Sequence, residues 1–187
     1  MAGDYSLLLT GDWSPDGSVL SVSDYSRGAL GFISTGQEPE VEWLEPPRGV
    51  KYLFPAFSPD GRWVAYSSDE TGNSEIWIRS FPDGEQLHQI STEGGIEPVW
   101  IGSGELFYHS GHRWMVVRVS TNPRLQWEPP QLAFETEYVD TPGRSYDVSS
   151  DGRYLYVVKS AHPPDPTRLY VVQNWFEELK RLVPTDN

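Results

Sequence analysis

A repeated turn sequence constrains the fold of this 187-residue chain more than any other feature. Residues 13–17, Trp-Ser-Pro-Asp-Gly, recur as residues 57–61, Phe-Ser-Pro-Asp-Gly, and looser copies end at Gly104 and Gly152. The final glycines are spaced about 45 residues apart, close to the period of a four-stranded propeller blade. The repeat therefore predicts one structural unit that occurs four times.

The chemistry of the turn sequence indicates hairpins. Proline has the φ angle needed at the second position of a type I turn, and glycine follows where a left-handed backbone is often required. Short apolar or alternating segments flank each turn, which is typical of strands. The predicted strands are residues 7–9, 18–22, 30–33, 41–44, 53–57, 63–67, 75–79, 86–90, 98–100, 106–109, 114–119, 131–134, 146–148, 154–158 and 168–172.

These fifteen strands predict an all-β fold. The composition agrees, because 8 Trp, 10 Tyr and 7 Phe favour strands, while 17 Gly and 16 Pro favour tight turns. The whole chain, residues 1–187, is expected to form a single β-propeller domain of four antiparallel blades. The blades are predicted near residues 5–45, 50–91, 95–135 and 143–173.

A short helix is predicted at residues 174–183, where the last blade lacks a fourth strand. Asn174 caps it, Glu177 completes a capping box, and Trp175, Leu179 and Leu182 share one face. The following Pro184 ends the helix.

The repeats resemble the TolB-like, WD-repeat-like β-propeller family. The resemblance rests on the Ser-Pro-Asp-Gly turns, on residues 61–70 and 75–82, and on residues 145–152 and 174–179. It is strongest to the propeller at the C-terminus of bacterial serine/threonine protein kinases. It implies a non-catalytic sensory or protein-binding module in a periplasmic or extracytoplasmic location; the family's namesake contacts a peptidoglycan-associated lipoprotein. Gly102-Ser103-Gly104 and Ser150 depart from the turn pattern.

Composition excludes several classes of protein. A net charge of -13 argues against nucleic-acid binding, which needs a basic surface. No apolar run reaches the roughly 18 residues of a membrane helix, so no membrane insertion is expected. The chain has no cysteine, and its first residues do not resemble a signal peptide.

Two groups of residues invite metal hypotheses. His109 and His112 have a spacing that suits one metal ion, but a hairpin tip carrying a polar histidine is the simpler interpretation. Asp69, Glu70, Asn73 and Glu75 offer calcium ligands, but they also suit a hairpin between two strands. His88 and His162 stand alone in the sequence. We therefore predict no metal site and no cofactor.

Enzyme motifs are missing from the sequence. It has no Gly-x-Ser-x-Gly nucleophile elbow and none of the loops of a protein kinase, so we predict no catalytic residues and no enzyme. Most aromatic side chains are expected to pack between blades. They are Trp63, Tyr66, Trp77, Phe107, Tyr108, Tyr154 and Tyr156.

Function and ring closure leave alternatives open. The first hypothesis is a propeller that binds a protein or a small ligand. The second is a fragment that forms an eight-blade ring as a homodimer, and the third is a propeller hydrolase or lyase. A ring needs its first and last blades joined or covered, because an open sheet edge exposes backbone groups. We favour the homodimer over a closed monomer and over a half-ring covered by the C-terminal helix.

Overall fold

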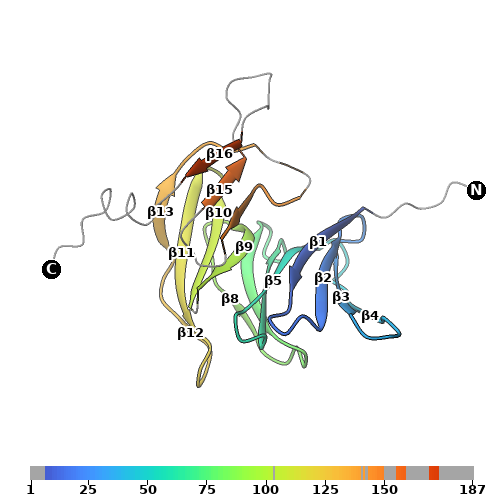
Figure 1. The fold of residues 1–187 in the computed structure, drawn as a ribbon. Helices are drawn as coiled ribbons and strands as arrows, with labels where there is room; N and C mark the ends of the chain where they lie inside the picture. Colours follow the sequence, from blue (N-terminus) through green and yellow to red (C-terminus); the bar gives the residue numbers. More distant parts are fainter. Residues whose placement is uncertain are drawn as a thin grey trace, which may run out of the picture.

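The computed structural model describes residues 7–102, 104–139, 141, 143–149, 155–158 and 169–172. Within these residues it contains sixteen strands and no helix, and the strands form four antiparallel sheets (Figure 1). The chain is therefore all-β in its described part, as predicted. The helix predicted at residues 174–183 lies outside the described residues.

The sheets follow the order of the chain. The first sheet contains β1 (Leu8–Trp13), β2 (Val19–Asp24), β3 (Ala29–Ser34) and β4 (Val41–Leu44). The second contains β5 (Tyr52–Phe57), β6 (Trp63–Ser68), β7 (Glu75–Ser80) and β8 (Leu87–Gln89). The third contains β9 (Ile96–Ile101), β10 (Glu105–Ser110), β11 (Arg113–Ser120), β12 (Gln126–Trp127) and β13 (Gln131–Glu135). The fourth contains β14 (Tyr146–Val148), β15 (Leu155–Val158) and β16 (Leu169–Val172).

The sequence-based strand count was wrong by one element. Every predicted strand is present, but β12 was not predicted, and it pairs with β11 beside the pairing of β13 with the same strand. Pro129 and Pro130 separate β12 from β13, and proline has no N–H to donate to a neighbouring strand. The outer edge of the third sheet is therefore divided into two short strands.

The Ser-Pro-Asp-Gly segments form the predicted turns. The Gly17 N–H donates to the Ser14 carbonyl at 2.8 Å, and the Gly61 N–H donates to the Ser58 carbonyl at the same distance. The φ angles of Gly17 and Gly61 are +71° and +70°, a region that favours glycine. Each turn joins the first and second strands of its sheet.

The aspartates of these turns are expected to make stability depend on acid pH. The Ser14 hydroxyl lowers the pKa of Asp16 to about 2. Partial burial opposes ionisation of Asp60, but hydrogen bonds from the Ser58 hydroxyl and the Arg62 N–H lower its pKa to about 2. Because the ordinary aspartate pKa is 3.8, both carboxylates stabilise the folded state above about pH 4 and lose this contribution as the pH falls toward 2.

Urea unfolding between pH 2 and pH 6 tests this expectation. Asp60→Asn should be less stable than the wild type at pH 6, and its stability should fall less steeply between pH 4 and pH 2. Parallel pH profiles for the two proteins would contradict a stabilising role of the Asp60 carboxylate.

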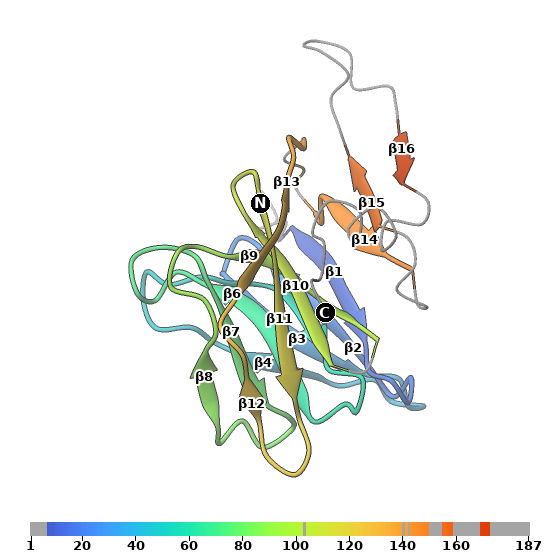
Figure 2. The ribbon, with the colours of Figure 1, turned by 90° about the vertical axis from the view of Figure 1, so that its left-hand side faces the viewer.

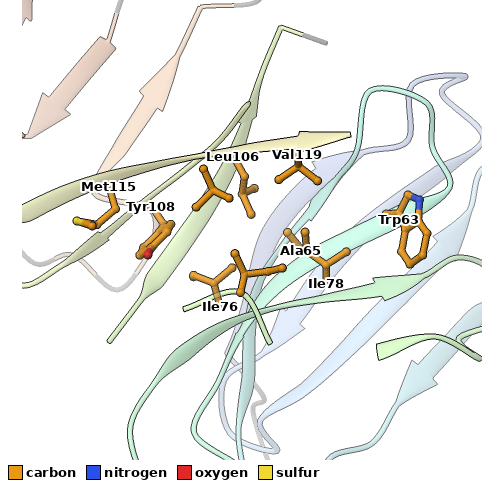
Figure 3. Packing of buried hydrophobic residues seen from close by; sticks show 10 residues of the cluster. Trp63, Ala65, Ile76, Ile78, Leu106, Tyr108, Met115 and Val119 are labelled. Carbon is orange, nitrogen blue, oxygen red and sulfur yellow. The ribbon is translucent and has the colours of Figure 1, made fainter. Parts of the chain in front are cut away.

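The core lies between neighbouring sheets that pack face to face. Trp63, Ile76 and Ile78 of the second sheet meet Leu106 and Tyr108 of the third sheet in one buried cluster (Figure 3). A second cluster joins the third sheet to the fourth, and a third cluster joins the first sheet to the second. Trp63, Tyr66, Phe107 and Tyr108 are buried, which confirms the predicted role of these aromatic residues.

The first strands of the sheets lie at the inner side of this arrangement. Strand β1 packs beside β5, β5 packs beside β9, and β9 contacts β14 (Figures 1 and 2). The later strands of each sheet lie progressively farther from this centre, so the fold brings four first strands from distant parts of the sequence together. Among the described residues, no helix has the length and apolar character needed to cross a membrane.

Candidate functional site

Polar groups from three sheets and from the segment before β14 meet where the first strands converge. We call this place the inner-strand site and define it by Asp12, Pro55, Glu97, Arg144 and Ser145. The Arg144 Nη2 donates to the Pro55 carbonyl at 2.8 Å. The positive charge of Arg144 also favours the ionised form of the Asp12 carboxyl. The Ser145 N–H donates to the Glu97 Oε2 at 2.7 Å. The site therefore depends on the relative position of all four sheets.

The same kind of hydrogen bond holds β5 and β9 to the sheet before each of them. The Phe54 N–H donates to the Ser23 Oγ at 3.0 Å, and the Glu97 N–H donates to the Ser67 Oγ at 3.1 Å. Both Phe54 and Glu97 precede a proline and have positive φ angles, 57° and 56°. Such angles are costly for residues other than glycine, so the surrounding structure must hold the backbone in place.

The contact between the third and fourth sheets uses a carboxylate in place of a serine. Ser145 has the same position in the repeat as Phe54 and Glu97. Its N–H donates a hydrogen bond to the Glu97 carboxylate, where Phe54 and Glu97 donate to a serine hydroxyl. The Ser145 hydroxyl donates to the Glu97 Oε1 at 3.0 Å. His109 occupies the position that Ser67 has in the second sheet, and its Nε2 lies 3.5 Å from the Glu97 Oε2. A buried polar cluster therefore joins these two sheets.

Tyr146 closes the buried side of this cluster. Its hydroxyl lies 2.5 Å from the Glu97 carbonyl oxygen and 3.0 Å from the Phe107 carbonyl oxygen. Burial raises the pKa of the Tyr146 phenol well above its ordinary value, so the group is a neutral donor at physiological pH. It anchors β14 to β9 and β10.

The other half of the inner-strand site carries charges that are only partly buried. Burial raises the pKa of Asp12, while the charge of Arg144 and the backbone N–H groups of Trp13 and Phe57 act in the opposite direction. Nearby Asp147 is exposed and raises the Asp12 pKa further. The buried Nε of Arg144 has no hydrogen-bond partner among the described residues. This half therefore places the carboxylates of Asp12 and Asp147 beside a guanidinium group whose Nε is buried.

The arrangement of Glu97, His109 and Ser145 does not form a catalytic triad. In a triad the serine is hydrogen-bonded to the histidine, which the carboxylate orients. Here Ser145 and His109 both face the same carboxylate, and all three side chains are buried. The cluster is suited to holding sheets together.

The structure separates the two histidines of the metal hypothesis. His109 is fully buried, with its Nδ1 3.3 Å from the Gly111 carbonyl oxygen, whereas His112 is exposed. The expected hairpin tip is present between β10 and β11 and carries the exposed His112, whereas His109 lies within β10 on the inside of the fold. Its pairing with Trp114 across β10 and β11 places the ring on an interior face, where Tyr138 also packs against it. His88 lies beside Trp127, and His162 lies outside the described residues.

The candidate calcium ligands are engaged in separate interactions. The Asp69 Oδ1 accepts the Lys51 N–H at 2.7 Å, while buried Glu75 accepts bonds from the Ser91 hydroxyl and the Gly94 N–H. In the described part of the chain, no group of three or more acidic or histidine side chains is placed to hold a metal ion.

Two cavities are lined by residues other than those of the inner-strand site. One of about 110 Å³ is lined by Trp43, Tyr66 and Arg79 at the contact of the first and second sheets. Another of about 320 Å³ is lined by Glu93 and Arg113 beside the third sheet. Both are alternative places for a small ligand.

Sequence reasoning did not identify Asp12, Glu97 or Arg144. The one available signal was the repeated position before proline, since Glu97-Pro98 corresponds to Phe54-Pro55 in the repeat. Glu97 is acidic where the second sheet has the apolar Phe54, which indicates that this position makes a polar contact in the third sheet.

Comparisons with known proteins identify the fold. No family model matches the chain. TolB of Acinetobacter baumannii has a TM-score of 0.59 at 18% identity, with 89% of this chain and 40% of TolB covered. A structure of a nidogen–laminin complex has a TM-score of 0.60 at 16% identity, with 90% of this chain and 65% of the other covered. The fold is a β-propeller.

Two further matches concern the length of a relative and the range of functions found in this fold. An uncharacterized protein of Agrobacterium fabrum is 27% identical over 142 residues, which cover 74% of this chain and 45% of that protein. The chain thus spans less than half the length of this relative. Hydrazine synthase of Kuenenia stuttgartiensis, an enzyme, has a TM-score of 0.57 at 14% identity, with 92% of this chain and 53% of that chain covered. Propeller folds therefore include both binding proteins and enzymes. The function has to be inferred from the residues of the site and not from the fold.

Proposed function

We propose that the chain is a non-catalytic β-propeller module that binds a protein or a small ligand at the inner-strand site. In this proposal the four sheets are four blades, and ligand binding depends on their first strands. The observation that carries it is the convergence of Asp12 of the first sheet and the Pro55 carbonyl of the second sheet with Arg144 of the segment before β14. A partly buried site with a few directed polar groups suits recognition of a ligand.

The contacts of the buried cluster favour binding over catalysis. The Ser145 hydroxyl is bonded to the Glu97 carboxylate, and all three side chains of Glu97, His109 and Ser145 lie away from solvent, so they do not present a nucleophile to a substrate. The accessible groups are Asp12, Asp147 and Arg144, which provide charge and hydrogen bonds. These groups support the recognition of a polar surface.

The resemblance to TolB-like propellers supports the biological setting of the proposal. It favours a sensory or scaffolding role outside the cytoplasm, as for the propellers that end bacterial serine/threonine kinases. The net charge of -13 would attract a partner with a basic surface and speed its association. A protein partner is therefore our first choice of ligand.

Arg144→Ala tests the proposed site, with the soluble domain of a peptidoglycan-associated lipoprotein as the probe. We expect binding to weaken by roughly tenfold or more, because arginines in the centre of an interface often dominate its affinity. Biolayer interferometry on the full chain measures the dissociation constant, and circular dichroism checks that the variant is folded.

Arg118→Ala is the matched control. Arg118 lies on the third sheet, is 72% exposed, and makes only long ion pairs of 3.9 Å with Glu105 and Glu128. Its removal should change the affinity less than twofold. Equal affinities for Arg144→Ala and wild type would contradict binding at the inner-strand site.

A further inference from the structure

One face of each sheet is turned toward the position of the sheet that comes before it in the chain, and we call it the leading face. In three of the four sheets, another sheet covers the leading face. In the second sheet it includes Phe57 and Tyr66, which are buried against the first sheet. In the third sheet it includes Leu106 and Tyr108, which are buried against the second sheet (Figure 3). The fourth sheet packs its leading face on the third.

Within the part of the chain that the structure describes, the leading face of the first sheet is apolar and uncovered. Strand pairing places Trp13, Leu20, Ile33 and Val41 in one row across β1 to β4. Trp13 is 54% exposed and Val41 is 44% exposed, while Leu20 and Ile33 are only partly buried. No residue that the structure describes covers this row, so the described residues leave an apolar surface exposed here.

The repeat shows what kind of surface would cover it. Trp13 precedes its Ser-Pro-Asp-Gly turn as Phe57 does, and Phe57 is only 3% exposed because the first sheet covers it. The corresponding residue of the third sheet is Trp100, whose Nε1 donates to the Ala56 carbonyl of the second sheet at 3.2 Å. A sheet of the same repeat would therefore suit Trp13 in both shape and hydrogen bonding.

We propose that a second copy of this chain covers this face with its fourth sheet. Within one chain the leading faces of the second, third and fourth sheets are covered by the sheet before them, and in a two-chain ring the partner's fourth sheet would come before the first sheet. The product is a closed ring with two-fold symmetry and two identical contacts.

The repeat also predicts a specific contact in this dimer. Ala56, which accepts the Trp100 indole, corresponds to Asp147 in the fourth sheet. Trp13 of one protomer should therefore lie against the backbone of the partner's Asp147. Each inner-strand site would then lie next to the dimer contact, although the dimer does not depend on ligand binding.

Light scattering on the full chain across a concentration series tests the dimer. We expect a mass near twice 21.2 kDa for the wild type. Trp13→Glu should weaken the dimer by roughly 30-fold or more, as expected for a central tryptophan of an interface. Because Trp13 is already exposed in the single chain, this variant should fold normally. Trp127→Glu, at an exposed tryptophan of the third sheet, is the control and should remain dimeric.

Site-specific crosslinking tests which sheet of the partner is involved. The chain has no cysteine, so Trp13→Cys and Asp147→Cys each introduce a single reactive thiol. A mixture of these two variants should crosslink with a short bismaleimide, and Trp13→Cys alone should not. A mass of 21.2 kDa throughout the series would overturn the proposal, and so would a dimer that Trp13→Glu leaves intact. Crosslinking of Trp13→Cys to itself would overturn the assignment of the fourth sheet.

Discussion

Trp114→Ala is expected to lower the free energy of unfolding by about 3–5 kcal/mol, the usual cost of removing a large buried aromatic side chain. Trp114 is fully buried in β11, and its ring lies 5.5 Å from that of Phe134 in a stacked arrangement. It also meets Tyr146 of the fourth sheet edge to face at 4.8 Å. The substitution therefore removes contacts within the third sheet and between the third and fourth sheets.

Trp127→Ala provides the control for this measurement. Trp127 belongs to the same sheet but is 37% exposed, so its loss should cost less than about 1 kcal/mol. Urea unfolding followed by circular dichroism measures both variants, because a change in aromatic fluorescence would confuse the comparison. Similar costs for the two substitutions would contradict the central packing role of Trp114.

Glu97→Ala is expected to cost about 2–4 kcal/mol and to act on the contact between the third and fourth sheets. It would leave the Ser145 N–H and hydroxyl without their acceptor in a buried place, and would remove the carboxylate that faces His109. Removing one partner of a buried polar network costs much more than removing a surface charge. Glu97→Gln should cost less, because the amide retains one oxygen acceptor.

Hydrogen exchange locates the effect of this substitution. In Glu97→Ala, amides of β14 and β15 should lose protection first, while those of β2 and β6 should keep most of theirs. Glu93→Ala is the matched control, because Glu93 is 78% exposed and pairs with Arg113 on the surface. That control should cost less than about 1 kcal/mol. Uniform loss of protection in Glu97→Ala would contradict a role specific to the last two sheets.

The local parts of this fold were predictable from the sequence. The Ser-Pro-Asp-Gly turns depend on neighbouring residues alone, and β4 and β14 have the same bounds in the prediction and in the structure. Alternation of apolar residues was sufficient to place the strands. The short β12 was missed because two residues carry too little pattern to indicate a strand.

The inner-strand site could not be predicted because its contacts join distant residues. Ser145 and Glu97 are 48 positions apart, and Arg144 and Pro55 are 89 positions apart. A single sequence shows which residues are polar, but the pairing of those residues depends on how the sheets stack. The burial of His109 was missed for the same reason, since Tyr138 packs on it from outside its own hairpin.

We propose that the converging first strands of the four sheets form the binding site. Amide chemical shifts of the full chain, mapped by NMR while the soluble lipoprotein domain is added, test this proposal. We expect the largest changes at Asp12, Phe57, Arg144 and Asp147. Largest changes on the outer strands β4, β8 and β13, or at the residues that line the two cavities, would contradict it.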